Sequence, residues 1–310
     1  MRVMTSLTEL PDRGHQRTAL TFGAFDGIHL GHQALLRRVV ALGMQLDAVP
    51  TVVSFWPHPR QVLSPSAAPP LITTREERRR RLAEAGVELF VELPFEEVRG
   101  LSAETFASDL LVRTLHAAAV VVGPDQRFGR DRQGDGAFMT RILTPLGVTV
   151  AVAEPVLDDG GLPYSSSRIR AAVEAGDVLT ARRLLGRPHR LDGIVVRGDQ
   201  LGRTLGFPTA NLACETALVP KNGIYASWAH VRGVRHAAVT AIGTRPTFDG
   251  QDRRIETYVF DFDSDLYGQP FSVDLIAHLR DELRFDGIDP LIAQMHRDCE
   301  ASRRILAAEA

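Results

Sequence analysis

Residues 18–55 read TALTFGAFDGIHLGHQALLRRVVALGMQLDAVPTVVSF, and this stretch predicts how the first half of the chain folds. It opens with one apolar run, Thr18 to Phe25, and closes with another, Ala48 to Phe55. Between them, apolar residues recur at helical spacing over His32 to Leu46. Strand, helix and strand in this order form a βαβ unit, which joins two parallel strands through a right-handed crossover.

The alternation of strand-like and helical runs continues along the first half of the chain. Further strand-like runs occur at Leu89 to Leu93, Ala118 to Gly123 and Val148 to Ala153, with helical stretches between them. This alternation is typical of an α/β domain built on a parallel sheet. Two short helical segments then end at Gly186, and Pro188 cannot continue them. The sequence therefore predicts one domain over residues 1–186 and a second over 187–310.

Beyond this boundary the chain changes to short β-prone runs punctuated by Gly, Pro and Asp. These runs are Asp192 to Val196, Ile224 to Val231, Ala237 to Ile242, Glu256 to Phe262 and Phe271 to Leu279. Residues Leu291 to Leu306 read as a helix that closes the domain. Such a pattern predicts a small β-barrel or a sandwich.

Composition limits the classes of partner. The chain has 310 residues, with 36 basic and 38 acidic side chains and a formal charge of −2. A near-neutral chain has no global field to hold a nucleic-acid backbone, so nucleic acid is not expected as a partner. The two cysteines, Cys214 and Cys299, lack the CxxC spacing of a zinc or redox site. No stretch approaches the roughly 20 apolar residues that cross a bilayer. We expect a cytoplasmic protein with no membrane partner. The sequence does not indicate an oligomeric state.

The run REERRRR, residues 75–81, superficially resembles a nucleic-acid patch. Thr74 and Glu77 form a capping box, and Glu77 precedes Arg81 by one helical turn. These pairings favour a solvated helix face, and we assign the run no function.

A first chemical motif joins the first strand to the first helix. In GAFDGIHLGH, residues 23–32, small residues let a ligand approach the backbone, and the helix N-terminus favours an anion. His29 and His32 can direct two imidazole donors at the same phosphate oxygens. A glycine-rich connection with incidental histidines is the weaker explanation. Zinc is also weaker, because no third ligand lies nearby and the HExxH pattern is absent.

A second anion site is indicated by SSSRIR, residues 165–170. Taken alone, an N-cap followed by surface arginines is the simpler explanation. Taken with the histidine motif, the segment favours a phosphate site. The chain has neither a GxxxxGK[ST] loop nor GxGxxG, so a P-loop enzyme or a dinucleotide dehydrogenase is not supported.

A third motif lies in the C-terminal half, where three glycines precede Thr209 and Asn211. A hydroxyl and an amide two residues apart can both offer oxygen to Mg²⁺. On spacing alone, a turn-rich β connection is as good an explanation as a site. Glu256, without further context, is better explained as an exposed strand residue that pairs with an arginine.

Together, GAFDGIHLGH and SSSRIR resemble the HxGH and SSTxxR pair of the nucleotidyltransferases. More narrowly, the chain from about Ala19 to Asp298 resembles bacterial bifunctional FAD synthetases. Similar segments are FWPHPR at 55–60, VGPDQRFG at 122–129, GRTLGFPTANL at 202–212 and IETYVFDFDSDLYG at 255–268. Four residues depart from the family pattern, namely Ala24, Gln126, Ser167 and Arg245.

The resemblance implies a Rossmann-like nucleotidyltransferase domain, followed by a small antiparallel β-barrel with a closing helix. It further implies that the barrel phosphorylates riboflavin to FMN with ATP and Mg²⁺. The first domain would then adenylylate FMN to FAD and release pyrophosphate. ATP and Mg²⁺ are therefore the expected cofactors, and the flavins riboflavin, FMN and FAD are substrates and products.

The resemblance also implies the residues of each site. Catalytic roles fall to His29, His32, Ser165, Ser167, Arg168 and Glu256. In the first domain, ATP would contact Phe22, Gly23, Phe25, Asp26, Gly31 and Arg170. FMN would contact Phe55, His58, Pro59, Asp125 and Phe128. In the barrel, nucleotide and flavin would contact Gly198, Gly202, Gly206, Phe207, Pro208, Thr209, Asn211 and Arg280. Thr209 and Asn211 would hold the metal.

Two other classes of protein, and one alternative within the enzyme class, compete with this interpretation. A class I aminoacyl-tRNA synthetase shares an HxGH-like motif, but it would be expected to carry a basic tRNA-binding surface. A flavin-binding module that has lost catalysis would lack one of the key residues, yet His29, His32, Asn211 and Glu256 are all present. The remaining alternative is a single-activity protein in which one half only binds nucleotide.

Overall fold

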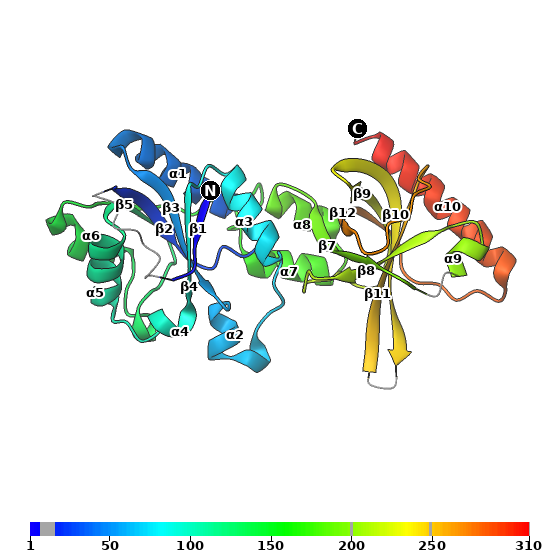
Figure 1. Cartoon of the computed structure of the whole chain (residues 1–310), viewed down its shortest axis with the longest axis horizontal. Coiled ribbons are helices and arrows are strands. Elements are labelled where there is room, and N and C mark those ends of the chain that lie inside the picture. Colours follow the sequence, from blue (N-terminus) through cyan, green and yellow to red (C-terminus); the bar gives the residue numbers. More distant parts are fainter. Residues whose placement is uncertain (7–15, 199–200, 248–249, 310) are drawn as a thin grey trace. The chain divides into compact units, whose positions relative to one another are not determined.

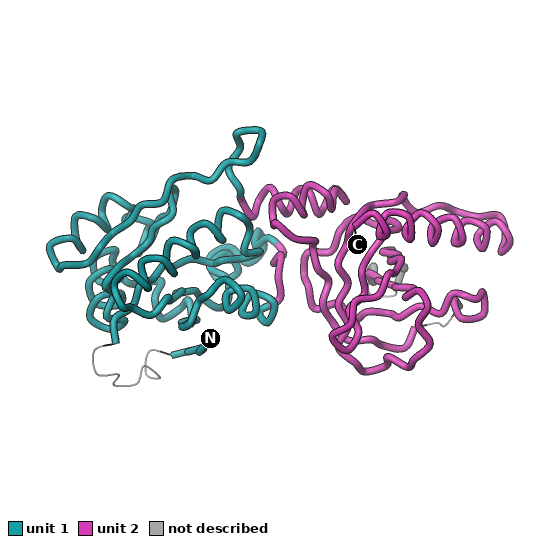
Figure 2. Tube along the Cα trace, turned by 90° about the horizontal axis from the view of Figure 1, so that it is seen from above, with its two compact units in different colours: residues 1–69, 75–164 teal, residues 70–74, 165–310 magenta. Residues whose placement is uncertain are grey.

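The computed structural model describes residues 1–6, 16–198, 201–247 and 250–309 (Figure 1). The chain forms two compact units, which are coloured separately in Figure 2. Unit 1 comprises Met1–Pro69 and Arg75–Tyr164, and unit 2 comprises Pro70–Thr74 and Ser165–Ala310.

Unit 1 is built on a six-stranded sheet in which every described pairing is parallel. The strand order is β1-β4-β3-β2-β5-β6. The strands are β1 (Arg2–Met4), β2 (Thr18–Phe22), β3 (Val49–Trp56), β4 (Leu89–Pro94), β5 (Ala117–Val122) and β6 (Thr149–Val152). The central strands are buried throughout, as expected when helices cover both faces of a parallel sheet.

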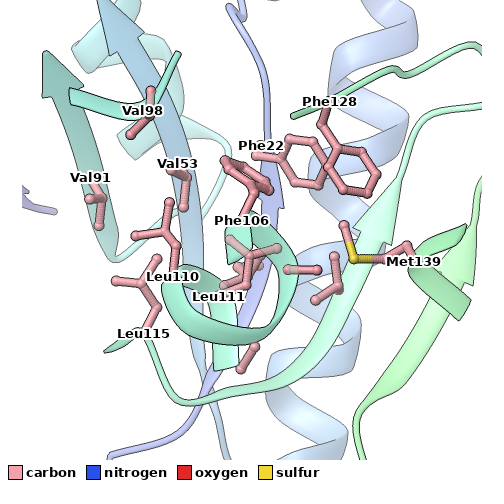
Figure 3. Close-up of a cluster of buried hydrophobic side chains, with 14 of the residues drawn as sticks. Phe22, Val53, Val91, Val98, Phe106, Leu110, Leu111, Leu115, Phe128 and Met139 are labelled. Carbon is pink, nitrogen blue, oxygen red and sulfur yellow. The ribbon is translucent and has the colours of Figure 1, made fainter. Parts of the chain in front are cut away.

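Two hydrophobic cores lie on opposite faces of this sheet. On one face, α1 (Leu30–Leu46) and α3 (Arg75–Glu84) pack against β2, β3, β4 and β5. On the other, α6 (Gly136–Leu143) and a π-helix (Phe106–Thr114) form a core with Phe22, Val53 and Val91 (Figure 3). Shorter elements are α2 (Pro59–Leu63), α4 (Phe95–Val98), α5 (Ala103–Thr105) and the 3-10 turns Pro65–Ala67, Arg130–Arg132 and Thr144–Leu146.

Unit 2 contains a closed barrel in which the strands pair antiparallel in the order β10-β11-β8-β7-β12-β9. The strands are β7 (His189–Val196), β8 (Thr209–Cys214), β9 (Gly223–Val231), β10 (Val234–Thr247), β11 (Gly250–Val259) and β12 (Pro270–Arg280). The helices are α7 (Ser166–Glu174), α8 (Val178–Leu185), α9 (Leu201–Thr204) and α10 (Ile288–Ala307).

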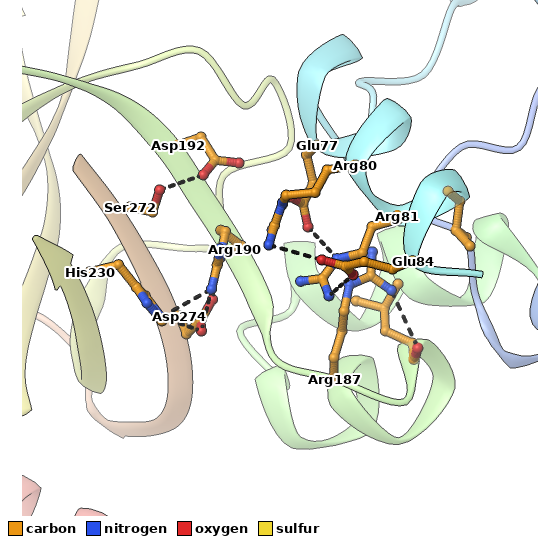
Figure 4. A network of polar contacts seen from close by, with 12 residues as sticks. Glu77, Arg80, Arg81, Glu84, Arg187, Arg190, Asp192, His230, Ser272 and Asp274 are labelled. Carbon is orange, nitrogen blue, oxygen red and sulfur yellow. Dashed lines mark hydrogen bonds and ion pairs between the residues drawn. The ribbon is translucent and has the colours of Figure 1, made fainter. Parts of the chain in front are cut away.

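Two groups of polar side chains in the barrel strands are joined by hydrogen bonds. Ser227, Thr240 and Thr257 are fully buried and form a chain of hydroxyl hydrogen bonds of 2.8 and 3.0 Å. The Asp274 carboxylate accepts hydrogen bonds from Arg190, at 2.6 and 2.8 Å, and lies 2.7 Å from His230 Nε2 (Figure 4). Burial would raise the pKa of Asp274, but these partners outweigh it and lower the pKa to about 2. Asp274 is therefore ionised at neutral pH and joins β12 to β7 and β9.

The predicted fold is confirmed in both halves. The parallel α/β sheet, the antiparallel barrel and the closing helix are all present, and of the two alternatives, barrel and sandwich, the barrel is observed. Two strands were not predicted, β1 and β8. The first has only 3 residues, and the second begins inside the segment that the glycine spacing suggested was a loop.

The prediction of a solvated face for residues 75–81 is wrong in part. The side chains of Glu77 and Arg78 are each only 4% exposed. Glu77 pairs with Arg80 and Arg81 of its own helix (Figure 4). Arg78 instead reaches a buried carboxylate on β4. One side of α3 is therefore an internal ion-pair surface.

Candidate active sites

The candidate site of unit 1 lies at the carboxyl edge of the sheet. The chain proceeds from β2 through β3 to β4 on one side and continues with β5 and β6 on the other, so the strand order reverses between β2 and β5. In open parallel sheets, ligands bind outside the carboxyl ends of the strands at such a switch point. The loop after β2 contains Gly23 to His29, and the loop after β5 contains Asp125.

The loop after β2 is held in a strained conformation. Phe25 and Ile28 have positive φ values of 49° and 41°, and Gly27 has a φ of 85°. For side chains as large as Phe and Ile this region is unfavourable, and such strain persists only where surrounding contacts enforce it. Both side chains are 2% exposed and pack in the α1 core. Their burial anchors the loop on either side of Asp26, which is itself 4% exposed.

His29 is the N-cap of α1. Its Nδ1 accepts a hydrogen bond from the backbone N–H of His32 at 3.3 Å. Because Nδ1 accepts, the neutral ring carries its proton on Nε2. A Cβ at Gly31 would lie 3.1 Å from the His29 ring and 3.3 Å from Tyr164. Glycine at this position therefore lets the His29 ring lie against the first turn of the helix.

His32 stacks on His29, with 3.7 Å between ring centroids and 19° between the planes. Burial, together with the neighbouring His29, lowers the pKa of His32 well below its ordinary value, so the ring is neutral at pH 7. Its Nδ1 is buried and has no hydrogen-bond partner among the described residues. A buried N–H without an acceptor is unfavourable, which favours the tautomer that carries its proton on Nε2. Two stacked rings thus offer Nε2–H donors at the start of one helix.

Gln126, one of the departures from the family pattern, joins the two loops of the switch point. Its side-chain carbonyl accepts a hydrogen bond from Gly123 N–H at 2.9 Å. Its side-chain amide donates to the carbonyl of Phe22, the last residue of β2. Gln126 therefore links the ends of β2 and β5, a contact that the sequence did not reveal.

The residues expected to line the FMN side lie at the end of β3 or follow β3 and β5, the two strands that flank β2. Phe55 and Phe128 are 9% and 6% exposed and belong to the core behind the loops. His58 caps α2, with Nδ1 accepting from Arg60 N–H at 3.1 Å, and Pro59 is the first residue of that helix. Asp125 is exposed. Phe55 and Phe128 therefore pack in the core, and His58 caps a helix.

The serine and arginine motif belongs to unit 2 and starts α7. Ser165 is the N-cap, and its hydroxyl accepts from Arg168 N–H at 3.3 Å. Ser167 is exposed, and Arg168 is half-buried. Arg170 Nε donates to the carbonyl of Pro70 at 2.8 Å. The motif therefore has the N-cap geometry that its sequence predicts.

The candidate site of unit 2 lies on one face of the β8–β11 pair. Asn211 lies directly opposite Glu256, and Thr209 lies opposite Tyr258. The alternate residues Ile255 and Val259 are buried in the barrel core, so Glu256 is on the outward face. The Thr209 hydroxyl donates to Glu256 Oε2 at 3.4 Å. The expected metal ligands and the expected base are thus neighbours.

The glycines before β8 allow close packing at this site. A Cβ at Gly198 would collide with the side-chain amide of Asn211, and a Cβ at Gly202 would collide with the Phe207 carbonyl. Gly206 has a φ of 85°, which favours glycine. Phe207 is 5% exposed and packs edge-on against Tyr258, with centroids 5.5 Å apart. Pro208, by contrast, is exposed.

Arg280 makes a contact that the sequence did not predict. Its guanidinium donates to the Asp298 carboxylate from Nε, at 3.0 Å, and from Nη2, at 2.7 Å. This pair joins β12 to α10. Arg245, the other departure in this half, lies outside the residues whose side chains are described.

The sequence and structure of this chain are similar to those of known proteins. The family model described as FAD synthetase matches residues 12–168, and the model described as riboflavin kinase matches residues 185–306. A bifunctional riboflavin kinase/FMN adenylyltransferase of Escherichia coli (strain K12) is 36% identical over 302 residues, covering 96% of this chain and 95% of the relative. The chain belongs to this bifunctional family. The family predicted from the motifs is confirmed.

A bifunctional riboflavin kinase/FMN adenylyltransferase of Pseudomonas fluorescens is 37% identical over 298 residues, covering 96% of this chain and 95% of the relative. A crystal structure described as that of a macrolide-efflux protein from Streptococcus pneumoniae superposes with a TM-score of 0.87 and 30% identity, covering 97% of this chain and 98% of the other. Among the described residues, no helix is long and apolar enough to cross a membrane.

As a member of this family, the chain catalyses two consecutive reactions. The C-terminal part phosphorylates riboflavin to FMN, and the N-terminal part converts FMN to FAD. The small-molecule substrates are riboflavin, FMN and ATP, since a kinase and an adenylyltransferase both consume ATP.

Proposed function

We propose that His29 and His32 stabilise the transition state of adenylyl transfer. The FMN phosphate attacks the α-phosphorus of ATP, the bond to the bridging oxygen breaks, and pyrophosphate leaves. The phosphate is already an anionic nucleophile at neutral pH, so no strong base is required. What the reaction needs is preorganised donors for the charge that develops on the α-phosphoryl oxygens. The observation that carries this proposal is the stacked pair of rings at a helix N-terminus, in which the His32 ring is neutral.

Ser165, Ser167 and Arg168 are proposed as catalytic residues, with Arg168 contacting the departing pyrophosphate. The N-cap geometry of α7 supports this role, because a helix N-terminus attracts anions. The proposed ATP contacts are Phe22, Gly23, Phe25, Asp26, Gly31 and Arg170. The FMN contacts remain Phe55, His58, Pro59, Asp125 and Phe128, of which the exposed Asp125 is the most accessible.

In unit 2, we propose that Glu256 accepts the proton of the riboflavin hydroxyl as that oxygen attacks the γ-phosphorus of ATP. Thr209 and Asn211 offer a hydroxyl and an amide oxygen beside this carboxylate, and hard oxygen donors suit Mg²⁺. These residues therefore fit the ion, which would neutralise charge on the phosphates. Gly198, Gly202, Gly206, Phe207 and Pro208 would wrap the nucleotide. Arg280 would contact the nucleotide or the flavin, with its guanidinium oriented by Asp298 on α10.

Product analysis tests the residue assignments together. Riboflavin, ATP and Mg²⁺ are incubated with the full chain and with variants of His29 and Glu256, and the flavins are separated by chromatography. Loss of His29 should leave FMN as the end product, and loss of Glu256 should leave riboflavin. FAD accumulation by either variant at the wild-type rate would contradict the corresponding assignment.

The domain division at residues 186/187 is a further proposal, and the packing of α8 sharpens its test. Val178 of α8 is 1% exposed and belongs to the barrel core. A fragment of residues 165–310 should therefore melt at a higher temperature than one of residues 187–310, and both should phosphorylate riboflavin without forming FAD. Calorimetry and chromatography measure the two properties. A folded 187–310 fragment that binds riboflavin but makes no FMN would refute this division.

We propose that the protein works in the cytoplasm. A cytoplasmic location is supported by Cys214 and Cys299, which are both free. Burial raises the pKa of each thiol to about 11, which makes both poor nucleophiles at neutral pH. We expect neither nucleic acid nor membrane as a partner.

A further inference from the structure

Glu92 on β4 is a carboxylate inside an otherwise apolar, buried strand. Its side chain is fully buried, and it pairs with three guanidinium groups of α3. Arg75 Nε lies 2.7 Å and Arg79 Nη2 lies 2.6 Å from Oε2, while Arg78 Nη2 contacts Oε1. Burial would raise the pKa of Glu92, but the hydrogen bonds from Arg75 and Arg79 and the charge of Arg78 outweigh it and lower the pKa. Glu92 is therefore a fixed, buried anion.

The three arginines differ in what else they contact. The side chains of Arg75 and Arg79 are 38% and 32% exposed, whereas that of Arg78 is 4% exposed. The Arg78 guanidinium lies 5.5 Å from the Trp56 ring centroid and 5.8 Å from that of Phe90. These rings and Glu92 fix the plane of the Arg78 guanidinium.

The remaining edge of Arg78 is directed at the loop after β2. Its Nη1 donates to the carbonyl of Ala24 at 3.1 Å, and the same carbonyl accepts from Ser54 Oγ at 3.4 Å. Asp26, two residues further on, also attracts the Arg78 charge. The contact therefore falls between Gly23 and the strained Phe25, in the segment that leads to His29.

A buried ion pair is seldom the most stable way to fill a core, because removing two charges from water costs several kcal/mol. Here the cost is greater, since Arg78 Nε is also buried and has no hydrogen-bond partner in the part of the chain that the structure describes. A strained loop, by contrast, needs contacts that enforce its conformation. The hydrogen bond from Arg78 to the Ala24 carbonyl meets that need, because Arg78 is itself held between a strand and a helix. The position of such a loop matters for the rate, since a misplacement of about 1 Å at an active site can cost 10²-fold.

We infer that Arg78 is a positioning residue for adenylyl transfer: held by Glu92, it fixes the Ala24 carbonyl and thereby the loop that places His29 and His32. This inference rests on the proposed role of the two histidines. Arg78 touches no reacting atom in this scheme and acts only through the loop.

A matched pair of variants in the full chain tests it. Arg78→Gln and Arg79→Gln each remove one cation from Glu92, but only the first removes the contact with Ala24. We expect Arg78→Gln to lower kcat for FAD formation from supplied FMN by at least about tenfold. Arg79→Gln should stay within about threefold of wild type, because it leaves the loop contact in place. Riboflavin phosphorylation should be unchanged in both. Equal losses in the two variants would overturn the inference.

A double-mutant cycle with His32→Ala separates positioning from general stability. If Arg78 acts through the histidines, Arg78→Gln should cost less than about twofold once His32 is absent, since coupled residues are not additive. Full additivity would contradict the inference. If His32→Ala alone leaves FAD formation intact, the proposed role of the histidines fails instead. Should Arg78→Gln lower the melting temperature far below that of Arg79→Gln, Arg78→Lys, which keeps the charge beside Glu92, replaces it in the same cycle with the same expected coupling.

Discussion

Replacing His32 by alanine is expected to lower FAD formation from supplied FMN and ATP by about 10²–10³, the usual loss for one preorganised donor. The neutral His32 ring offers its Nε2–H from a stacked position on His29, where no reorganisation is needed during the reaction. The effect should appear in kcat more than in KM, because the interaction strengthens only as charge develops. Steady-state kinetics with separated flavins measures both.

The control for this variant lies in the same unit at the other end of the sheet. His116 is exposed and precedes β5, so it lies at the amino edge. Its φ is 50°, which asparagine tolerates. His116→Asn should therefore retain FAD formation, and both variants should retain riboflavin phosphorylation. If His32→Ala reduced both activities equally, the loss would come from global destabilisation and not from the missing donor.

The architecture could be predicted because apolar runs mark the buried strands, and glycine and proline mark the ends of helices. The apolar run LFVEL at 89–93 was correctly predicted as a strand, and Gly186 adopts the left-handed conformation that ends α8. The strand β8 escaped prediction because its residues Thr209 and Asn211 face outward and its glycine-rich approach resembles a loop. Strand β8 forms because β7 and β11 pair with it on both sides, which no local pattern reveals.

The site residues were predictable where a motif is local, and less so where the contact is distant in sequence. His29 and His32 lie one helical turn apart and were expected to act together, as their stacking supports. Gln126 and Phe22 are separated by 104 positions, so their hydrogen bond has no sequence signature. Glu92 did leave a signal: a carboxylate within a strand expected to be fully buried requires partners. The arginine run at 75–81 supplies those partners.

Glu256→Gln is the corresponding change in unit 2, and we expect kcat for FMN formation to fall by at least about 10². The amide keeps the shape of the side chain and can still accept from the Thr209 hydroxyl, which now lies 3.4 Å from Oε2. It cannot take the proton of the riboflavin hydroxyl. Riboflavin and ATP should therefore bind with dissociation constants within a few-fold of wild type, and adenylylation of supplied FMN should persist. Calorimetric titration and product analysis measure these quantities.

This experiment also distinguishes two mechanisms of phosphoryl transfer, one with proton transfer to Glu256 and one that depends on positioning alone. Glu215 is an exposed carboxylate just beyond the far end of β8, and Glu215→Gln controls for the loss of one negative charge from the same barrel. If Glu256→Gln keeps a near-normal kcat, Glu256 is not the base, and Thr209 and Asn211 become the main contributors through the nucleotide and its metal. Phosphoryl transfer through a loose transition state depends weakly on deprotonation of the nucleophile, so positioning could then account for the rate. A selective fall in kcat, absent from Glu215→Gln, would instead require proton transfer to Glu256.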